Sequence, residues 1–110
     1  MNTMILEPEV VERAFHALTP QDRAEVFSVG AAFHRLNLAK RLERSEHEVH
    51  EFEGRYHTTL AELEAEGLPD DADYAMHEDY IEWHYWSRML EQTQKALNTL
   101  SLLAPVVELA

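Results

Sequence analysis

The stretch EGLPDDAD, residues 66–73, decides the fold because it separates two long helical patterns. Gly67 suits the left-handed conformation that commonly ends a helix, and Pro69 prevents that helix from continuing. The aspartates of the stretch then offer a cap and first-turn negative charge to the next helix. A short connection of this kind predicts two antiparallel helices that form a hairpin.

The residues before this stretch predict one long helix over about 20–66. Thr19 can cap the helix, Pro20 suits its first position, and no further proline occurs until Pro69. From residue 38 onward a heptad repeat appears, whose first seam position holds Leu42, Val49, Tyr56 and Leu63 and whose second holds Leu38, Ser45, Phe52 and Thr59. This coiled-coil-like pattern predicts packing against another helix, from the same chain or from a second copy.

Two further helices complete the prediction of an all-α fold in one domain, residues 1–110. A short amphipathic helix is expected over about 8–18, and a long one over about 72–103. The second places its large apolar residues on one broad side: Met76, Tyr80, Trp83, Trp86, Met89, Leu90, Leu97 and Leu100. A hairpin alone is too thin to cover these aromatic rings, so we expect a homodimer or a tight heteromeric complex.

Charge is spread unevenly along the chain, whose net charge is −12. Residues 45–82 hold thirteen acidic side chains and one basic side chain, Arg55. Such a region repels nucleic acid and anionic membranes and attracts a basic protein partner. The alternative is that the charge serves solubility alone.

A basic cluster precedes the acidic region and consists of Arg35, Lys40, Arg41 and Arg44. Basic residues in the middle of a helix beside many acids are typical of ion pairs within or between chains. We therefore expect ion pairing here and no contact with nucleic acid.

The expected location is the cytoplasm. The first residues lack a basic region followed by an apolar run, so they do not predict a secretory signal. No stretch approaches the roughly 20 apolar residues that a membrane-spanning helix needs. The absence of cysteine fits a reducing compartment and excludes thiolate chemistry.

The histidines present a candidate metal site but no catalytic motif. Glu43, His47, His50 and His57 fall on one face of a continuous helix, where histidines one turn apart can chelate a metal. His47 and His50 are one residue too close for the zinc-protease motif, and none of the seven histidines completes a Glu-x-x-His pair. The sequence thus predicts no enzyme and no cofactor, with a metal-binding helical protein as an alternative.

Residues 74–86 carry the densest group of aromatic side chains, interleaved with acids and histidines. Tyrosine and tryptophan dominate the energetics of protein interfaces. The predicted partner-binding residues are Tyr74, Asp79, Tyr80, Glu82, Trp83, Tyr85 and Trp86. The alternative is that these rings form a simple core near the hairpin loop.

Three segments carry a resemblance to a known family. They are FEGRYHTTLAEL (52–63), GLPD (67–70) and HEDYIEW (77–83), which together are similar to small acidic helical proteins of prokaryotes that look like antitoxins of toxin–antitoxin pairs. The resemblance implies a protein that caps a basic toxin. It implies no catalytic residue, and no DNA-binding motif accompanies it. A homodimer with a purely structural role remains an alternative.

Overall fold

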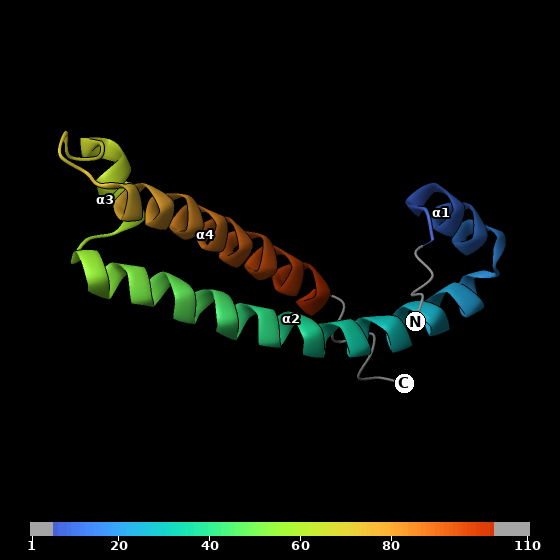
Figure 1. Ribbon diagram of the computed structural model, residues 1–110. Coiled ribbons are helices and arrows are strands. Elements are labelled where there is room, and N and C mark those ends of the chain that lie inside the picture. Colours follow the sequence, from blue (N-terminus) through green and yellow to red (C-terminus); the bar gives the residue numbers. More distant parts are fainter. Residues whose placement is uncertain (1–5, 103–110) are drawn as a thin grey trace, which may run out of the picture. The chain divides into compact units, whose positions relative to one another are not determined.

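The computed structural model describes residues 6–102, which form four helices and no strand (Figure 1). The helices are α1 (Pro8–Ala17), α2 (Pro20–Tyr56), α3 (Leu60–Glu66) and α4 (Tyr74–Ser101). The prediction of an all-α fold is confirmed. The expected end of the last helix at residue 103 lies outside the described residues. The chain divides into two compact units, Met1–His34 and Arg35–Ala110, and the division falls within α2.

The first unit joins α1 to the start of α2 through a tight corner. Thr19 caps α2 as predicted, since its hydroxyl accepts a hydrogen bond from the Asp22 amide at 3.1 Å. Arg23 then reaches back and donates to the carbonyl oxygens of His16 and Leu18, at 3.2 and 2.8 Å. These bonds satisfy carbonyls that the end of α1 leaves without a helical partner. No side chain of α1 is buried.

The second unit is an antiparallel hairpin of α2 and α4. Arg35 Nη2 donates to the Leu100 carbonyl at 3.1 Å, and Arg41 Nε donates to Thr93 Oγ1 at 2.8 Å. At the other end of the hairpin, Arg55 of α2 pairs with Asp79 of α4. Residue numbers therefore rise along α2 as those of its partners fall along α4, which establishes the antiparallel direction.

The predicted seam of α2 is covered within the chain. Leu38, Ser45 and Phe52, from its second position, are 1%, 0% and 6% exposed. The buried Ser45 hydroxyl donates to the Arg41 carbonyl at 2.7 Å, so this small polar residue leaves no unpaired donor in the core. On α4 the buried Thr93 hydroxyl does the same with the Met89 carbonyl, also at 2.7 Å.

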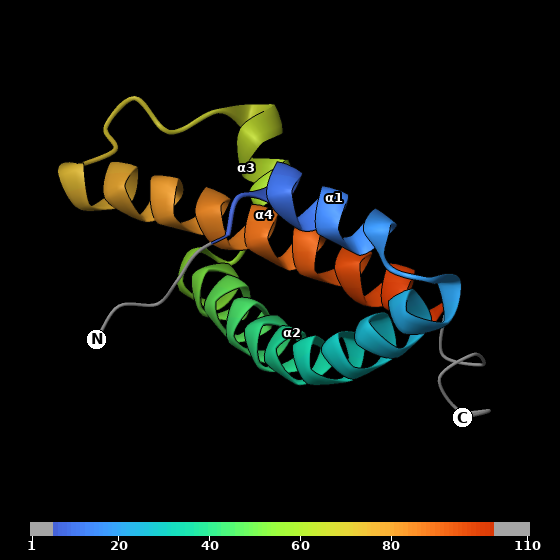
Figure 2. The same ribbon diagram turned by 90° about the vertical axis from the view of Figure 1, so that its right-hand side faces the viewer.

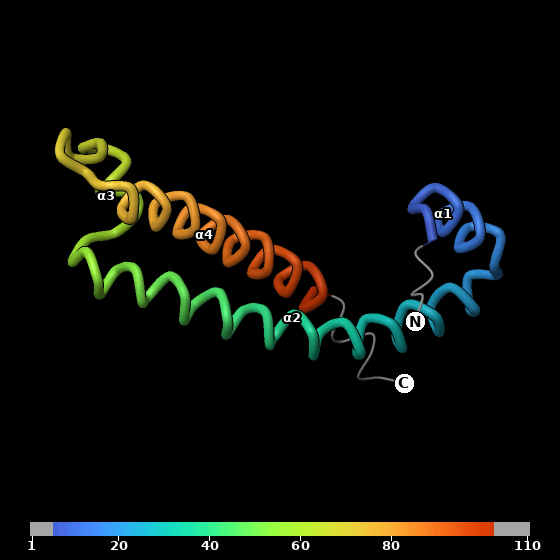
Figure 3. Tube along the Cα trace, viewed as in Figure 1, coloured from blue at the N-terminus to red at the C-terminus, as the bar shows by residue number. Residues whose placement is uncertain are grey.

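The prediction of one helix over 20–66 is wrong at residues 57–59. The helix α2 ends at Tyr56, and His57 adopts a φ of 53°, a left-handed conformation that ends a helix. Thr59 then caps α3, because its hydroxyl accepts from the Glu62 amide at 3.2 Å. Figure 3 shows the chain leaving the axis of α2 at this point. Threonine followed three residues later by glutamate is a signature of a helix start. Here it lies inside the heptad repeat, which predicted one continuous helix.

The structure of the loop after α3 agrees closely with its prediction from the sequence. Gly67 ends α3 with a φ of 80°, and its amide donates to the Leu63 carbonyl at 2.7 Å. Asp73 caps α4 by accepting from the Met76 amide at 2.9 Å, so α4 starts two residues later than predicted. The loop and α3 together connect the end of α2 to the start of α4 (Figure 2).

The core of the second unit lies where α2, α3 and α4 meet. Trp83 of α4 is fully buried and packs with Phe52 of α2 and Leu63 of α3. The Trp83 ring stacks on Phe52 and on Tyr56, with centroids 5.7 and 5.9 Å apart and interplanar angles of 17° and 15°. Aromatic side chains of this size dominate the energy of small cores. The break before α3 thus lets Leu63 close over the tryptophan.

Candidate protein-binding surface

The helix α4 divides the aromatic segment between two sides. One side faces the core and carries Met76, Tyr80, Trp83 and Trp86. The other side remains open to solvent and carries Tyr74, Ile81 and Tyr85, which are 78%, 64% and 54% exposed. The core is therefore complete without these three side chains.

The three exposed side chains share one face of α4. Positions 74, 81 and 85 are separated by two turns and one turn, so they line up along the helix. Glu78 and Glu82, both exposed, lie beside them at similar spacing. We call these five residues, Tyr74, Glu78, Ile81, Glu82 and Tyr85, the outer face of α4. Hydrogen bonding to Glu78 raises the pKa of Tyr74.

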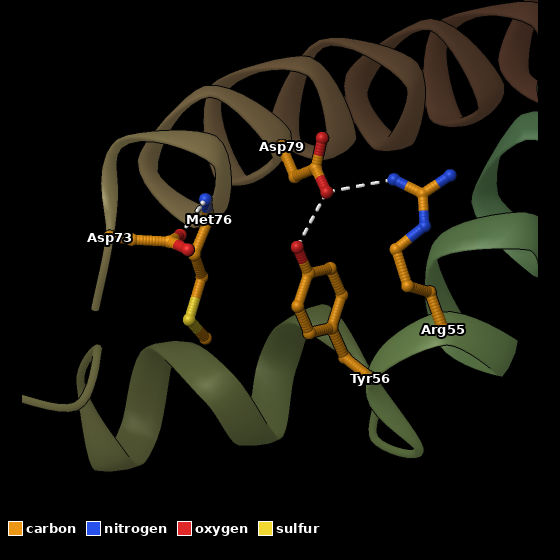
Figure 4. A network of polar contacts seen from close by, with 5 residues as sticks. All are labelled: Arg55, Tyr56, Asp73, Met76 and Asp79. Atoms are coloured by element: carbon orange, nitrogen blue, oxygen red, sulfur yellow. Dashed lines mark hydrogen bonds and ion pairs between the residues drawn. The ribbon is translucent and has the colours of Figure 1, made fainter. Parts of the chain in front are cut away.

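Asp79 lies beside the outer face, but its contacts stabilise the hairpin. Its carboxylate accepts hydrogen bonds from the Tyr56 phenol and from Arg55 Nη1, the latter at 2.7 Å (Figure 4). The bond from Tyr56, together with Arg55, holds the pKa of Asp79 below its usual value. The same bond raises the pKa of Tyr56, because the phenol would lose its role as donor on ionising.

A depression of about 470 Å³ adjoins the outer face. Its walls come from α2, from the start of α3 and from α4, where His84 and Arg88 lie within one turn of Tyr85. Three carboxylates from the three helices line it: Glu53, Glu64 and Glu91. Carboxylates outnumber Arg88 here, so the depression favours a positively charged side chain of a partner.

The predicted partner-binding residues therefore separate into two groups. Tyr74, Glu82 and Tyr85 are exposed, as contact with a partner requires. Trp83 is fully buried and its ring belongs to the core, so it is not exposed to a partner in this structure. Tyr80 and Trp86 pack against that core, and Asp79 is engaged by Arg55 and Tyr56.

Ile81 is the exposed residue that the sequence analysis missed. Its spacing of seven residues from Tyr74 and four from Tyr85 is the signal that places it on their face.

The candidate metal face is not assembled as expected. His57 leaves the helix, with a φ of 53°, and so does not continue the face of Glu43, His47 and His50. Glu43 and His47 line a depression of about 380 Å³ with Lys40 and Arg44, whose positive charges oppose a metal cation. Within residues 6–102, no three histidine, aspartate or glutamate side chains form a group suited to a metal.

Three arginines of the basic cluster of α2 contact α4. Arg35 and Arg41 bond to α4 through a carbonyl and a hydroxyl, and Arg44 stacks over the Trp86 ring with its guanidinium carbon 5.0 Å from the centroid. None of these three arginines forms an ion pair within the described part of the chain, whose ion pairs are Arg55–Asp79 and Lys95–Glu91. The arginines fasten the hairpin. Ion pairs with another chain stay a prediction.

The described helices include none with the length and apolar character needed to cross a membrane. No family model, curated protein or solved structure matches the chain.

Proposed function

We propose that the chain is a non-enzymatic protein-binding module whose outer face of α4 holds a basic protein partner. The observation that carries the proposal is the division of α4. Its inner side fills the core, while Tyr74, Ile81 and Tyr85 stay exposed between glutamates. Exposed aromatic residues are costly to leave in water and typical of interface anchors.

Charge supports a basic partner over a neutral one. The outer face contributes Glu78 and Glu82, and the adjoining depression contributes Glu53, Glu64 and Glu91. All of these except Glu91 belong to the region of residues 45–82, which carries a net charge of −12. A field of this strength accelerates the encounter with a basic protein and selects against acidic ones.

An antitoxin-like role is the specific form of the proposal. It combines the resemblance over residues of about 50–90 with a surface that carries exposed aromatic side chains and acidic side chains. In this role the module neutralises a basic toxin by covering its surface, without catalysis.

Capture from a lysate of the native host tests the binding. The bait is the full chain, and its test variant is Tyr74→Ser/Ile81→Ser/Tyr85→Ser, which leaves the core residues in place. Val11→Ser is the matched control, because Val11 is an exposed apolar residue of α1 at 45% exposure. We expect the wild type and the control to retain one basic protein in stoichiometric amount, released as salt rises. We expect the triple variant to bind it at least about 30-fold more weakly.

Equal retention by the triple variant, or retention of no basic protein, contradicts the binding proposal. Expression of the captured protein alone then tests the antitoxin role. It should arrest growth, and co-expression of the wild type should restore growth while the triple variant fails to do so. A captured protein that is harmless alone would contradict the antitoxin role and leave the binding module intact.

A further inference from the structure

A second apolar stripe lies on α2. It consists of Val26, Val29, Phe33 and Leu36, which are 54%, 73%, 69% and 65% exposed. Their spacings of three, four and three residues match the core positions of a coiled coil. We propose that this stripe binds a second copy of the chain, with the two α2 helices antiparallel, to form a symmetric dimer.

The stripe is separate from the surface that packs inside the chain. At 100° per residue, these four positions lie opposite Leu38, Ser45 and Phe52, which are buried. Figure 3 shows α2 as one uninterrupted helix, so the register of the stripe follows from the helix alone. On α2 itself, the exposed stripe and the buried residues therefore lie on different sides of the helix.

Charged residues bound the stripe at both ends in the same register. Asp22 lies four residues before Val26, and Lys40 lies four residues after Leu36. Both belong to α2, and neither forms an ion pair among the described residues. They therefore stand at the next core-type positions of the repeat, with opposite charge.

When two α2 helices run antiparallel, each of these residues faces a complementary residue of the other copy. A two-fold axis opposite residue 31 brings together the pairs Val26 with the partner's Leu36, Val29 with the partner's Phe33, and Asp22 with the partner's Lys40. Apolar layers thus form the middle, and one ion pair closes each end. A parallel arrangement would place Asp22 against Asp22 and Lys40 against Lys40, which repel.

The residues beside the stripe permit close approach near the axis. Gly30 and Ala32 lie at the flanking positions, and Asn37 and Ala39 follow one heptad later. A Cβ atom added at Gly30 would meet nothing within 4 Å, so the space beside the helix is open. Small flanking residues let two helix backbones come near enough for the apolar layers to pack.

Charge also identifies a second copy as the occupant. Residues 26–42 contain no aspartate or glutamate, the longest such stretch of this chain of net charge −12. Two copies repel each other through the acidic region, and least where acids are absent. The self-complementary order of one acidic end, apolar middle and one basic end is what a two-fold interface requires.

Analytical ultracentrifugation of the full chain tests the dimer. We expect a reversible dimer for the wild type, and a dissociation constant at least about 100-fold higher for Phe33→Glu. Ile81→Glu is the matched control, since Ile81 is about as exposed as Phe33 but lies on α4. It should leave the dissociation constant unchanged. Far-ultraviolet circular dichroism confirms that each variant keeps its helices.

A charge exchange tests the antiparallel register. Asp22→Lys and Lys40→Asp should each weaken the dimer several-fold, because each places like charges together at both ends. The double variant Asp22→Lys/Lys40→Asp should restore it, since the two opposite charges have merely changed places.

A wild type that stays monomeric at 100 μM overturns the dimer, as does a dimer that Phe33→Glu leaves intact. If the double variant does not recover the dimer affinity that both single variants lost, the antiparallel register is overturned. These outcomes are independent of the proposed function, whose test variant changes α4 and whose control changes α1.

Discussion

The phenol of Tyr56, the last residue of α2, donates a hydrogen bond to the carboxylate of Asp79 in the second turn of α4. The same phenol ring stacks on Trp83, one turn further along α4. One side chain thus connects the polar closure of the hairpin with its aromatic core. Substitutions of Tyr56 or of its partners should therefore change the stability of the whole second unit.

The first prediction concerns Asp79. Asp79→Asn should lower the free energy of unfolding at pH 7 by about 1–2 kcal/mol, because a charged acceptor is lost from two hydrogen bonds. Since the pKa of Asp79 is lowered by folding, its stabilisation is fully present above the unfolded pKa of about 3.9 and is lost as the pH falls further. Urea denaturation of both proteins at pH 7 and pH 3 measures this. An equal difference at the two pH values would contradict the assignment.

The second prediction uses the two tryptophans of the chain as separate probes. In Trp86→Phe, the remaining Trp83 is fully buried and should emit at short wavelength and resist quenching by iodide. In Trp83→Phe, the half-buried Trp86 should emit at longer wavelength and be quenched more readily. Steady-state fluorescence decides this, and similar quenching in the two variants would mean that Trp83 does not fill the core.

The third prediction tests the break between α2 and α3. His57→Gly should stabilise the chain by up to about 1 kcal/mol, because its left-handed backbone costs an ordinary residue about that much. A continuous helix would instead make the same change unfavourable by about 1 kcal/mol. Gly54→Ala, inside α2 with open space around the added methyl group, is the control and should stabilise. Thermal denaturation followed by circular dichroism gives the sign of each change.

The fourth prediction concerns the cap of α3. Thr59→Ala should cost about 1 kcal/mol of stability, since the Glu62 amide loses its acceptor. Thr59→Ser keeps the hydroxyl and should cost much less. Comparable losses in the two variants, measured by chemical denaturation, would show that the hydroxyl has no capping role.

The fifth prediction concerns the acids of the outer face of α4. Glu78→Gln/Glu82→Gln should slow association with the captured basic partner and reduce its dependence on salt, because steering weakens when charge is removed. Dissociation should change less, since the aromatic residues remain. Surface plasmon resonance at two salt concentrations separates the two rates. An unchanged salt dependence would assign the steering to other residues.

Local sequence signals predicted the helix starts and stops well. Pro20 after Thr19, Gly67 before Pro69, and Asp73 are each sufficient within a few residues, because capping and backbone restriction act over one turn. Those positions appear in the structure at or near where they were expected. The seam of α2 was also predicted, since its period requires no knowledge of the partner helix.

The break at residues 57–59 was missed because a longer pattern masked a local one. The heptad positions of Tyr56, Thr59 and Leu63 continue the repeat, while the chain itself turns so that Leu63 can close over Trp83. The sequence placed Met76, Tyr80, Trp83 and Trp86 on one side of this helix, but it left open whether that side forms the core or binds a partner. The answer depends on which side of α4 meets Phe52 and Leu63, and that is decided by tertiary packing.

One side of α4 lies in the core and the other is exposed, and this affects how the chain can evolve. Substitutions at Tyr74, Ile81 and Tyr85 leave the Trp83 core unchanged, so under the proposed function the choice of partner can change without a loss of stability. Insertion of a single residue near the start of α4 would rotate every later position by about 100°. Core residues would then leave the core side, and outer residues would leave the exposed side. Related chains should therefore vary in the outer residues of α4 while keeping its length.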